Sequence, residues 1–222
     1  MNKILTIDCH MKKIIIIAAA LLLGFQAKAQ VIAGAGLAMA FERTKTVGGE
    51  TFPTTMFGIY AGANYYYSLD NLADGLAVLP GANFSGLFGN HWDIRNVRVR
   101  ELALNIPVQA SYTYEINEKV KIFGQTGPTF SLALSYKAKD AKGTTYPLLK
   151  KDNEFWQINV TPESRHLFNV SWGITAGAEV SDMLRIHLGV DFGFLNLNRR
   201  IERSVVDKIS RTTLHVGVGY LF

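Results

Sequence analysis

Cysteine is almost absent from this 222-residue chain: the single one, Cys9, lies near its beginning. One cysteine cannot form a disulfide within the chain, and it cannot build a thiolate metal site. If the first 29 residues are removed, as argued below, no thiol nucleophile remains either. We predict that the protein uses neither a cofactor nor a metal.

Long hydrophobic runs are also scarce, and the one present, IIIIAAALLLGF, extends from Ile14 to Phe25. It is too short to span a bilayer, which takes about 20 residues. Two lysines precede the run and the small-residue sequence AKA follows it, an order typical of a secretory signal peptide. We predict cleavage between Ala29 and Gln30, with Met11 as an alternative start. Residues 30–222 then form one mature domain.

The chain has no strong excess of charge. The full sequence carries a net charge of +5. Removal of residues 1–29 takes away four lysines and one aspartate, which leaves 19 basic and 17 acidic residues. Nucleic-acid binding depends on many basic contacts to phosphates, so this near balance argues against it.

Segments with a helical period are missing from the mature chain, where hydrophobic residues recur every second position. Between 184 and 194, one face has Leu184, Ile186, Leu188, Val190, Phe192 and Phe194, and the other has Arg185, His187, Gly189, Asp191 and Gly193. The same alternation predicts strands near 31–43, 54–68, 76–88, 97–114, 120–136, 168–180, 184–195 and 212–222.

Connection lengths distinguish a membrane barrel from a soluble β-sandwich, because apolar and polar residues alternate along the strands of both folds. The predicted gaps 69–75, 115–119 and 181–183 are short, whereas 44–53, 89–96, 137–167 and 196–211 are longer. Short periplasmic turns and long extracellular loops are typical of outer-membrane barrels. We therefore predict an all-β fold, an eight-stranded antiparallel up-and-down transmembrane β-barrel in a Gram-negative outer membrane, with both termini periplasmic.

Aromatic residues support this assignment because they favour membrane interfaces. The set expected at the periplasmic interface is Tyr65, Tyr67, Tyr112, Tyr114, Tyr220 and Phe222. The set expected at the opposite interface is Phe41, Phe57, Phe84, Phe88, Tyr136, Phe168, Trp172 and Phe194.

Three segments resemble the porin-family, or PorT-like, outer-membrane β-barrel proteins of Bacteroidota. They are ELALNIPVQASYTYEINEKVKIFGQTGPTFSLALS (Glu101 to Ser135), WGITAGAEVSDMLRIHLGVDFGFLNL and the closing TLHVGVGYLF. The resemblance implies an outer-membrane barrel whose last strand, with Tyr220 and Phe222, is the signal read by the outer-membrane assembly machinery. PorT itself is associated with type IX protein secretion, so an accessory role there is one implied function.

Charged residues at inward positions need partners, because an eight-stranded barrel has an interior that side chains fill. The predicted interior polar cluster consists of Glu101, Lys121, Glu179, Arg185, Asp191 and His215. Within it, we expect Lys121, Glu179 and Arg185 to form a buried ionic plug near the periplasmic end.

Asp191 and His215 lie on neighbouring predicted strands and point inward, so they can face each other. With Ser171 as the nearest inward serine, a catalytic arrangement is one interpretation. A hydrogen-bonded interior histidine explains the same residues, and we predict no enzymatic activity and no catalytic residues.

Arginines gather at the predicted outer rim: Arg95, Arg98, Arg100, Arg199, Arg200, Arg203 and Arg211. Arg98 and Arg100 share the outward parity of the neighbouring leucines, so phosphates of lipid A are one partner for them. A solvated charged rim is the alternative, and the sequence favours neither.

The first functional hypothesis is a non-enzymatic barrel with an envelope-structural role, or one that docks a secretion or envelope protein through loop 137–167 with Trp156. Outer-membrane lipids and lipopolysaccharide are its expected surroundings. The alternatives are a PorT-like secretion accessory, a small-solute porin and a lipid A-modifying enzyme.

Overall fold

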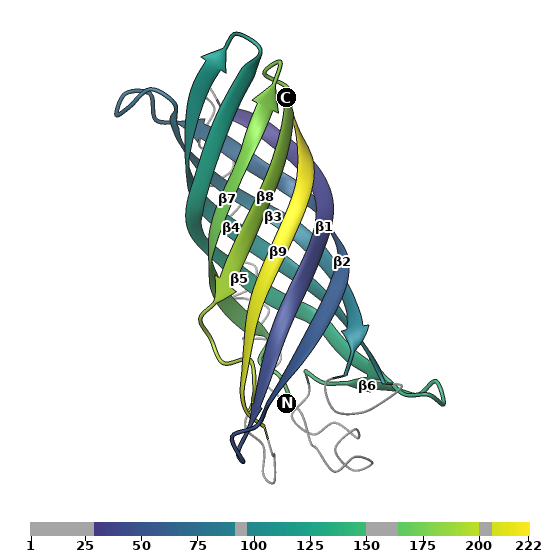
Figure 1. Ribbon diagram of the computed structural model, residues 1–222. Coiled ribbons are helices and arrows are strands. Elements are labelled where there is room, and N and C mark those ends of the chain that lie inside the picture. The colour runs from purple at the N-terminus through teal and green to yellow at the C-terminus, as the bar shows by residue number, and fades with distance from the viewer. Residues whose placement is uncertain (1–28, 92–96, 150–163, 200–205) are drawn as a thin grey trace, which may run out of the picture.

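The computed structural model describes residues 29–91, 97–149, 164–199 and 206–222. Residues 1–28 of the predicted signal peptide and Trp156 lie outside these ranges. Eight strands form a closed antiparallel barrel in chain order (Figure 1): β1 (Ala29–Thr46), β2 (Thr51–Ser68), β3 (Leu76–Asn90), β4 (Arg98–Asn117), β5 (Val120–Lys139), β7 (Phe168–Val180), β8 (Leu184–Gly193) and β9 (Val206–Leu221). Pairing of β1 with β9 closes the ring. The eight-stranded all-β prediction is confirmed.

The two ends of the barrel differ in their connections. Ala29 and Leu221 lie at one end with the connections 69–75, 118–119 and 181–183, and we call it the terminus end. The opposite end, the loop end, carries 47–50, 91–97, 140–167 and 194–205. The predicted long loop 44–53 is wrong, because β1 and β2 remain paired as far as Lys45 and Thr51. The short strand β6 (Thr145–Pro147), which was not predicted, pairs with the end of β5.

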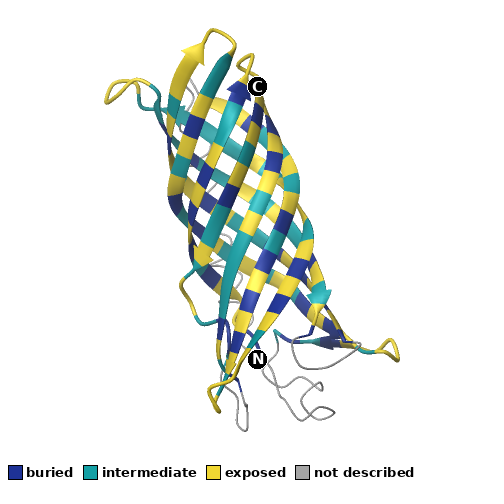
Figure 2. Cartoon of the chain, in the orientation of Figure 1, coloured by how far each residue is buried: buried dark blue, intermediate teal, exposed yellow. Residues whose placement is uncertain are grey.

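Outward positions carry the large exposed hydrophobic residues, so buried and exposed residues alternate along the strands (Figure 2). On β9, Leu214, Val216, Val218 and Tyr220 are exposed, as the alternation predicts. Most residues of both predicted aromatic sets are exposed as well. Within the described ranges, no helix is long and apolar enough to cross a membrane.

One predicted interface residue is misplaced: Tyr136 is buried inside the barrel, with 2% of its surface exposed. The cause is an irregularity between β4 and β5, where Leu102 pairs with Ser135 but Ala103 pairs with Ala133. Leu134 is therefore an extra residue that forms a β-bulge. After this bulge, the inward and outward positions of β5 are exchanged. Tyr136 turns inward, and its neighbour Lys137 turns outward.

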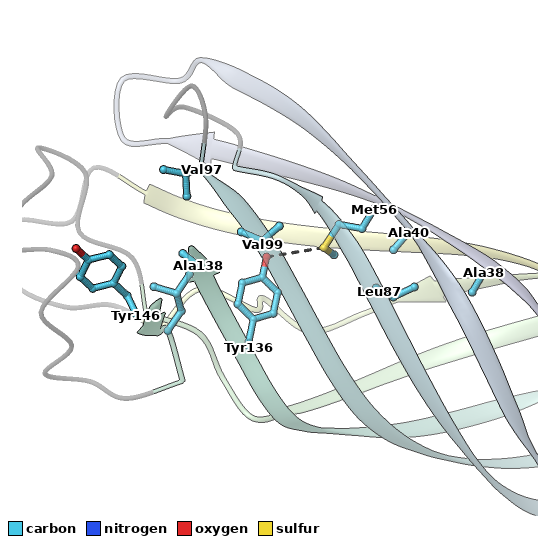
Figure 3. Close-up of a cluster of buried hydrophobic side chains, with 10 residues drawn as sticks. Ala38, Ala40, Met56, Leu87, Val97, Val99, Tyr136, Ala138 and Tyr146 are labelled. Carbon is cyan, nitrogen blue, oxygen red and sulfur yellow. Dashed lines mark hydrogen bonds between the residues drawn. The ribbon is translucent and has the colours of Figure 1, made fainter. Parts of the chain in front are cut away.

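Two apolar clusters fill parts of the interior. At the loop end, Tyr136 packs with Met56, Val99, Leu148 and their neighbours, and its hydroxyl donates to the Met56 sulfur at 4.0 Å (Figure 3). At the terminus end, Ile32, Ala77, Leu79 and Leu221 form the second cluster. The polar residues of the lumen lie between these ends.

Candidate functional site

Four charged side chains form an ionic layer near the loop end, and we call Glu42, Glu101, Arg165 and Arg211 the outer layer. Arg211 on β9 donates from Nη1 to Oε1 of Glu101 at 2.7 Å and from Nε to Oε1 of Glu42 at 2.9 Å. Its Nη2 also contacts Oε2 of Glu101. Because β4 and β9 are not neighbouring strands, the Arg211 to Glu101 link crosses the lumen.

Arg165 brings the connection 140–167 into this layer. Its Nη1 donates to Oε1 of Glu42 at 2.8 Å, and its guanidinium lies 4.1 Å from the ring centroid of Tyr136. The backbone N–H of Arg165 donates to the carbonyl of Leu148, and Arg165 pairs with Asn198 in an isolated bridge. Described parts of two loop-end connections therefore pack into the mouth of the barrel.

A second ionic contact, the inner pair, lies in the lumen towards the terminus end. Nε of Arg185 lies 3.1 Å from Oε2 of Glu179, and both side chains are buried. The Arg185 guanidinium also sits 3.9 Å from the ring centroid of Phe123, where the negative face of the ring attracts it. Aromatic packing and the carboxylate together hold this buried cation.

The predicted three-residue plug is wrong in its third member, Lys121. Although Lys121 stands opposite Glu179 in the strand register, its Nζ pairs with Asp182 at 2.7 Å. Lys121 is the second residue of β5, at the rim, so its long side chain reaches the exposed β7–β8 turn. Only Glu179 and Arg185 remain as the buried pair.

Hydrogen bonds link polar groups in the middle of the lumen. His215 Nδ1 lies 3.3 Å from Asp191 Oδ2, and its Nε2 lies 3.3 Å from Thr175 Oγ1. The register pairs Asp191 with Thr213, so this contact is diagonal across the strands. Ser171, named above as the nearest inward serine, donates instead to the Thr129 carbonyl at 3.5 Å.

Tyr60 on β2 spans the lumen and meets His187 of β8, with Oη 2.6 Å from Nε2. Glycine leaves space for the Tyr60 side chain, since a Cβ at Gly217 would lie 2.1 Å from the Tyr60 oxygen. A Cβ at Gly189 would similarly lie 2.3 Å from His215 Nε2 and 2.4 Å from Thr175 Oγ1. The sequence analysis does not predict these contacts, although the inward-facing glycines on β8 and β9 are a signal for them.

A polar cavity of about 160 Å³ lies between the outer layer and the inner pair. Glu101 and Arg211 line it towards one end, and Arg185 and Phe123 line it towards the other. Its walls include the side chains of Asn64, Asn105, Gln125, Thr175, His187, Asp191 and His215. Such walls suit water or a small polar solute. Among the described residues, no three acidic, histidine or cysteine side chains cluster as a metal site would require.

The predicted rim arginines have different positions. Arg98 and Arg100 face outward on β4 at the loop end, and the Arg100 guanidinium lies 5.7 Å from the ring centroid of Phe88. The prediction that Arg211 lies at the rim is wrong, because Arg211 occupies an inward-facing position of β9 and its side chain lies in the lumen. Arg199 is half-buried, and its backbone N–H donates to the Ser164 carbonyl. Arg95, Arg200 and Arg203 lie outside the described residues.

A closed antiparallel barrel with an apolar exterior and a polar interior is the architecture of an integral outer-membrane protein. Residues 15–222 match the family described as outer membrane protein beta-barrel domain, and the chain belongs to this family. It is thus an outer-membrane β-barrel protein of a Gram-negative bacterium. The narrower likeness to PorT-like proteins stays a prediction. No curated protein matches the sequence.

Small outer-membrane barrels of known structure are similar to the chain. Neisserial surface protein A shares 11% identity, with coverage of 88% of this chain and 100% of that one and a TM-score of 0.45. OprG of Pseudomonas aeruginosa shares 13%, with coverage of 88% and 96% and a TM-score of 0.44. The attachment invasion locus protein Ail of Yersinia pestis shares 14%, with coverage of 88% and 100% and a TM-score of 0.43.

Proposed function

We propose that this protein is a non-enzymatic outer-membrane barrel with a closed lumen, whose role is envelope-structural or the docking of a partner at the loop end. The observation that carries the proposal is that the interior holds two groups of buried ionic contacts, and that the outer layer links β9 to β4 across the lumen. The outer layer joins β1, β4 and β9 to a loop residue, and the inner pair fills the terminus end. Between them the lumen holds a cavity of about 160 Å³.

The geometry in the lumen supports a structural role for its histidines. Thr175, His215 and Asp191 have the order of a nucleophile, base and orienting acid. However, Thr175 is buried in the wall of a strand whose backbone groups pair with β5 and β8. A wall of this kind offers few free N–H groups to stabilise an oxyanion. Unchanged lipid A mass spectra in a deletion strain are expected, and loss of a modified species would contradict the proposal.

Conductance in planar lipid bilayers tests whether the lumen is closed. The refolded barrel is expected to give no steady single-channel steps, and so is the variant Glu179→Ala, which disrupts the inner pair but leaves the outer layer in place. Discrete, ion-selective steps from the unaltered protein would favour the small-solute porin instead.

Docking requires the loop end to face outside and the terminus end to face the periplasm, as short turns and long loops indicate. A photo-cross-linking amino acid at Lys142, exposed in the connection after β5, tests for a partner. The matched control is the same group at Glu118, exposed in the turn 118–119 at the terminus end. A protein adduct in native membranes from position 142 but not 118 is expected. Labelling of the same protein from both positions, or from neither, would contradict docking at the loop end.

A further inference from the structure

Four basic side chains form an exposed group on the outer wall at the loop end, and we call Arg98, Arg100, Lys137 and Lys139 the basic patch. Arg98 and Arg100 alternate with the buried Val99 and Glu101 on β4, so they face outward. Lys137 and Lys139 face outward on β5 only because the bulge at Leu134 reverses the alternation.

The strand register places these like charges side by side. Arg98 stands directly opposite Lys139, and Arg100 stands directly opposite Lys137. Side chains directly opposite on paired strands are about 5 Å apart at Cβ, and like charges there are destabilising. Residues two apart on one strand are roughly 7 Å apart. Four positive charges therefore share one small area of the wall.

Within residues 29–91, 97–149, 164–199 and 206–222, no carboxylate compensates this charge. Among the described residues, none of the four cations takes part in an ion pair. The nearby Glu101 points inward to Arg211, and Asp140 accepts hydrogen bonds from the Thr144 N–H at 2.8 Å and the Tyr146 hydroxyl at 3.2 Å. The patch is complementary to an anionic group with more than one charge.

The surroundings of the patch indicate what kind of anion it meets. Directly towards the membrane centre, Leu102 and Leu134 are exposed on the same two strands, and Phe88 is exposed on β3 opposite Arg100. The wall thus changes from apolar to basic along β4 and β5, as a surface does when it contacts acyl chains below and headgroups above. A free anion would need only the basic half of this surface.

We propose that the basic patch binds the phosphate groups of a phosphorylated glycolipid of the outer leaflet. Arginine forks and lysine ammonium groups are the usual ligands of phosphate in proteins. Lipid acyl chains then lie against Leu102, Leu134 and Phe88. The assignment rests on the proposed outward orientation of the loop end, but it is independent of whether the lumen conducts.

Native mass spectrometry of the folded barrel in non-ionic detergent tests this binding with bisphosphorylated lipid A as the probe. The variant Lys137→Gln with Lys139→Gln removes the two cations that the bulge presents. Loss of two basic groups near an anionic lipid is expected to weaken binding about thirtyfold. The matched control, Arg43→Gln with Lys45→Gln, removes two outward cations of β1 at the same end and should retain most of the affinity.

Heat-modifiable migration on gels shows whether each variant is folded. Lipid A stripped of its phosphates, added to the unaltered barrel, is a second test that needs no variant, and it should bind far more weakly. Equal loss in both double variants would overturn the proposal, as would equal binding of the stripped lipid. Full displacement by an equal concentration of inorganic pyrophosphate would assign the patch to free anions instead. These results are separate from conductance and from loop cross-linking, so either proposal can fail alone.

Discussion

At the scale of single residues, Arg211 is central because it contacts two carboxylates, Glu42 on the neighbouring strand β1 and Glu101 on β4 across the lumen. Glu42 is fully buried beside it, and burial of a carboxylate is unfavourable unless cations and hydrogen bonds compensate. Arg165 compensates Glu42 in part, whereas Glu101 has no other partner in the outer layer. Removal of Arg211 therefore leaves buried negative charge.

Arg211→Met is predicted to lower the free energy of unfolding by about 3–5 kcal/mol, the usual cost of breaking a buried ion pair from one side. Guanidinium unfolding in detergent micelles, followed by tryptophan fluorescence, measures the change. Arg43→Met is the control, because Arg43 is exposed on the neighbouring strand. It should cost about 1 kcal/mol or less. Similar losses in both variants would show that the outer layer contributes little.

The inward position of Arg211 could have been predicted from the sequence. The alternation places Thr213, His215 and Gly217 on the inward face. Extended by two residues towards the N-terminus, the same alternation places Arg211 on that face. It was missed because the strand was expected to begin at 212, whereas β9 begins at Val206. Its contact with Glu101 could not have been predicted, since alternation shows which side chains face inward but not which ones meet across a lumen.

At the scale of elements, the bulge in β5 determines which side chains face the lumen at the C-terminal end of this strand. Strict alternation places Tyr136 on the lipid side, and the structure places it inside against Met56 and Val99. Leu134 resembles its neighbours in the sequence, so no residue type marks the bulge. The sequence therefore predicts the strands and most of their faces, but it does not predict local changes of register.

Deletion of Leu134 is predicted to leave a folded barrel, because Ala133 and Ser135 already pair with consecutive residues of β4. The shortened strand then pairs without a bulge, with Tyr136 still inside and the lysines of the basic patch still outside. Refolding into detergent micelles, followed by heat-modifiable migration, measures the outcome. Deletion of Leu188 from the regular strand β8 is the contrasting variant and should not fold, because it exchanges the inward and outward faces on one side of the deletion. Failure of the chain without Leu134 to fold would show that the bulge itself is required.

At the scale of the whole molecule, ring closure depends on the last strand. β9 pairs with β8 on one side and β1 on the other, and the Phe222 N–H donates to the Val31 carbonyl at 2.9 Å. Phe222 itself is 72% exposed, and its ring lies 4.8 Å from that of Tyr220, centroid to centroid. Phe222 adds little burial to the finished barrel, so its contribution lies elsewhere.

Deletion of Phe222 is predicted to reduce outer-membrane insertion in cells strongly, while the purified chain still refolds in micelles. The barrel keeps its β1–β9 register without this residue, but the exposed pair of aromatic rings that we predict the assembly machinery reads is lost. Membrane fractionation measures the first effect, and heat-modifiable migration of refolded protein measures the second. Phe222→Tyr, which preserves an aromatic end, should insert normally. Normal insertion of the shortened chain would refute this role, and failure to refold in micelles would show that Phe222 stabilises the closed ring itself.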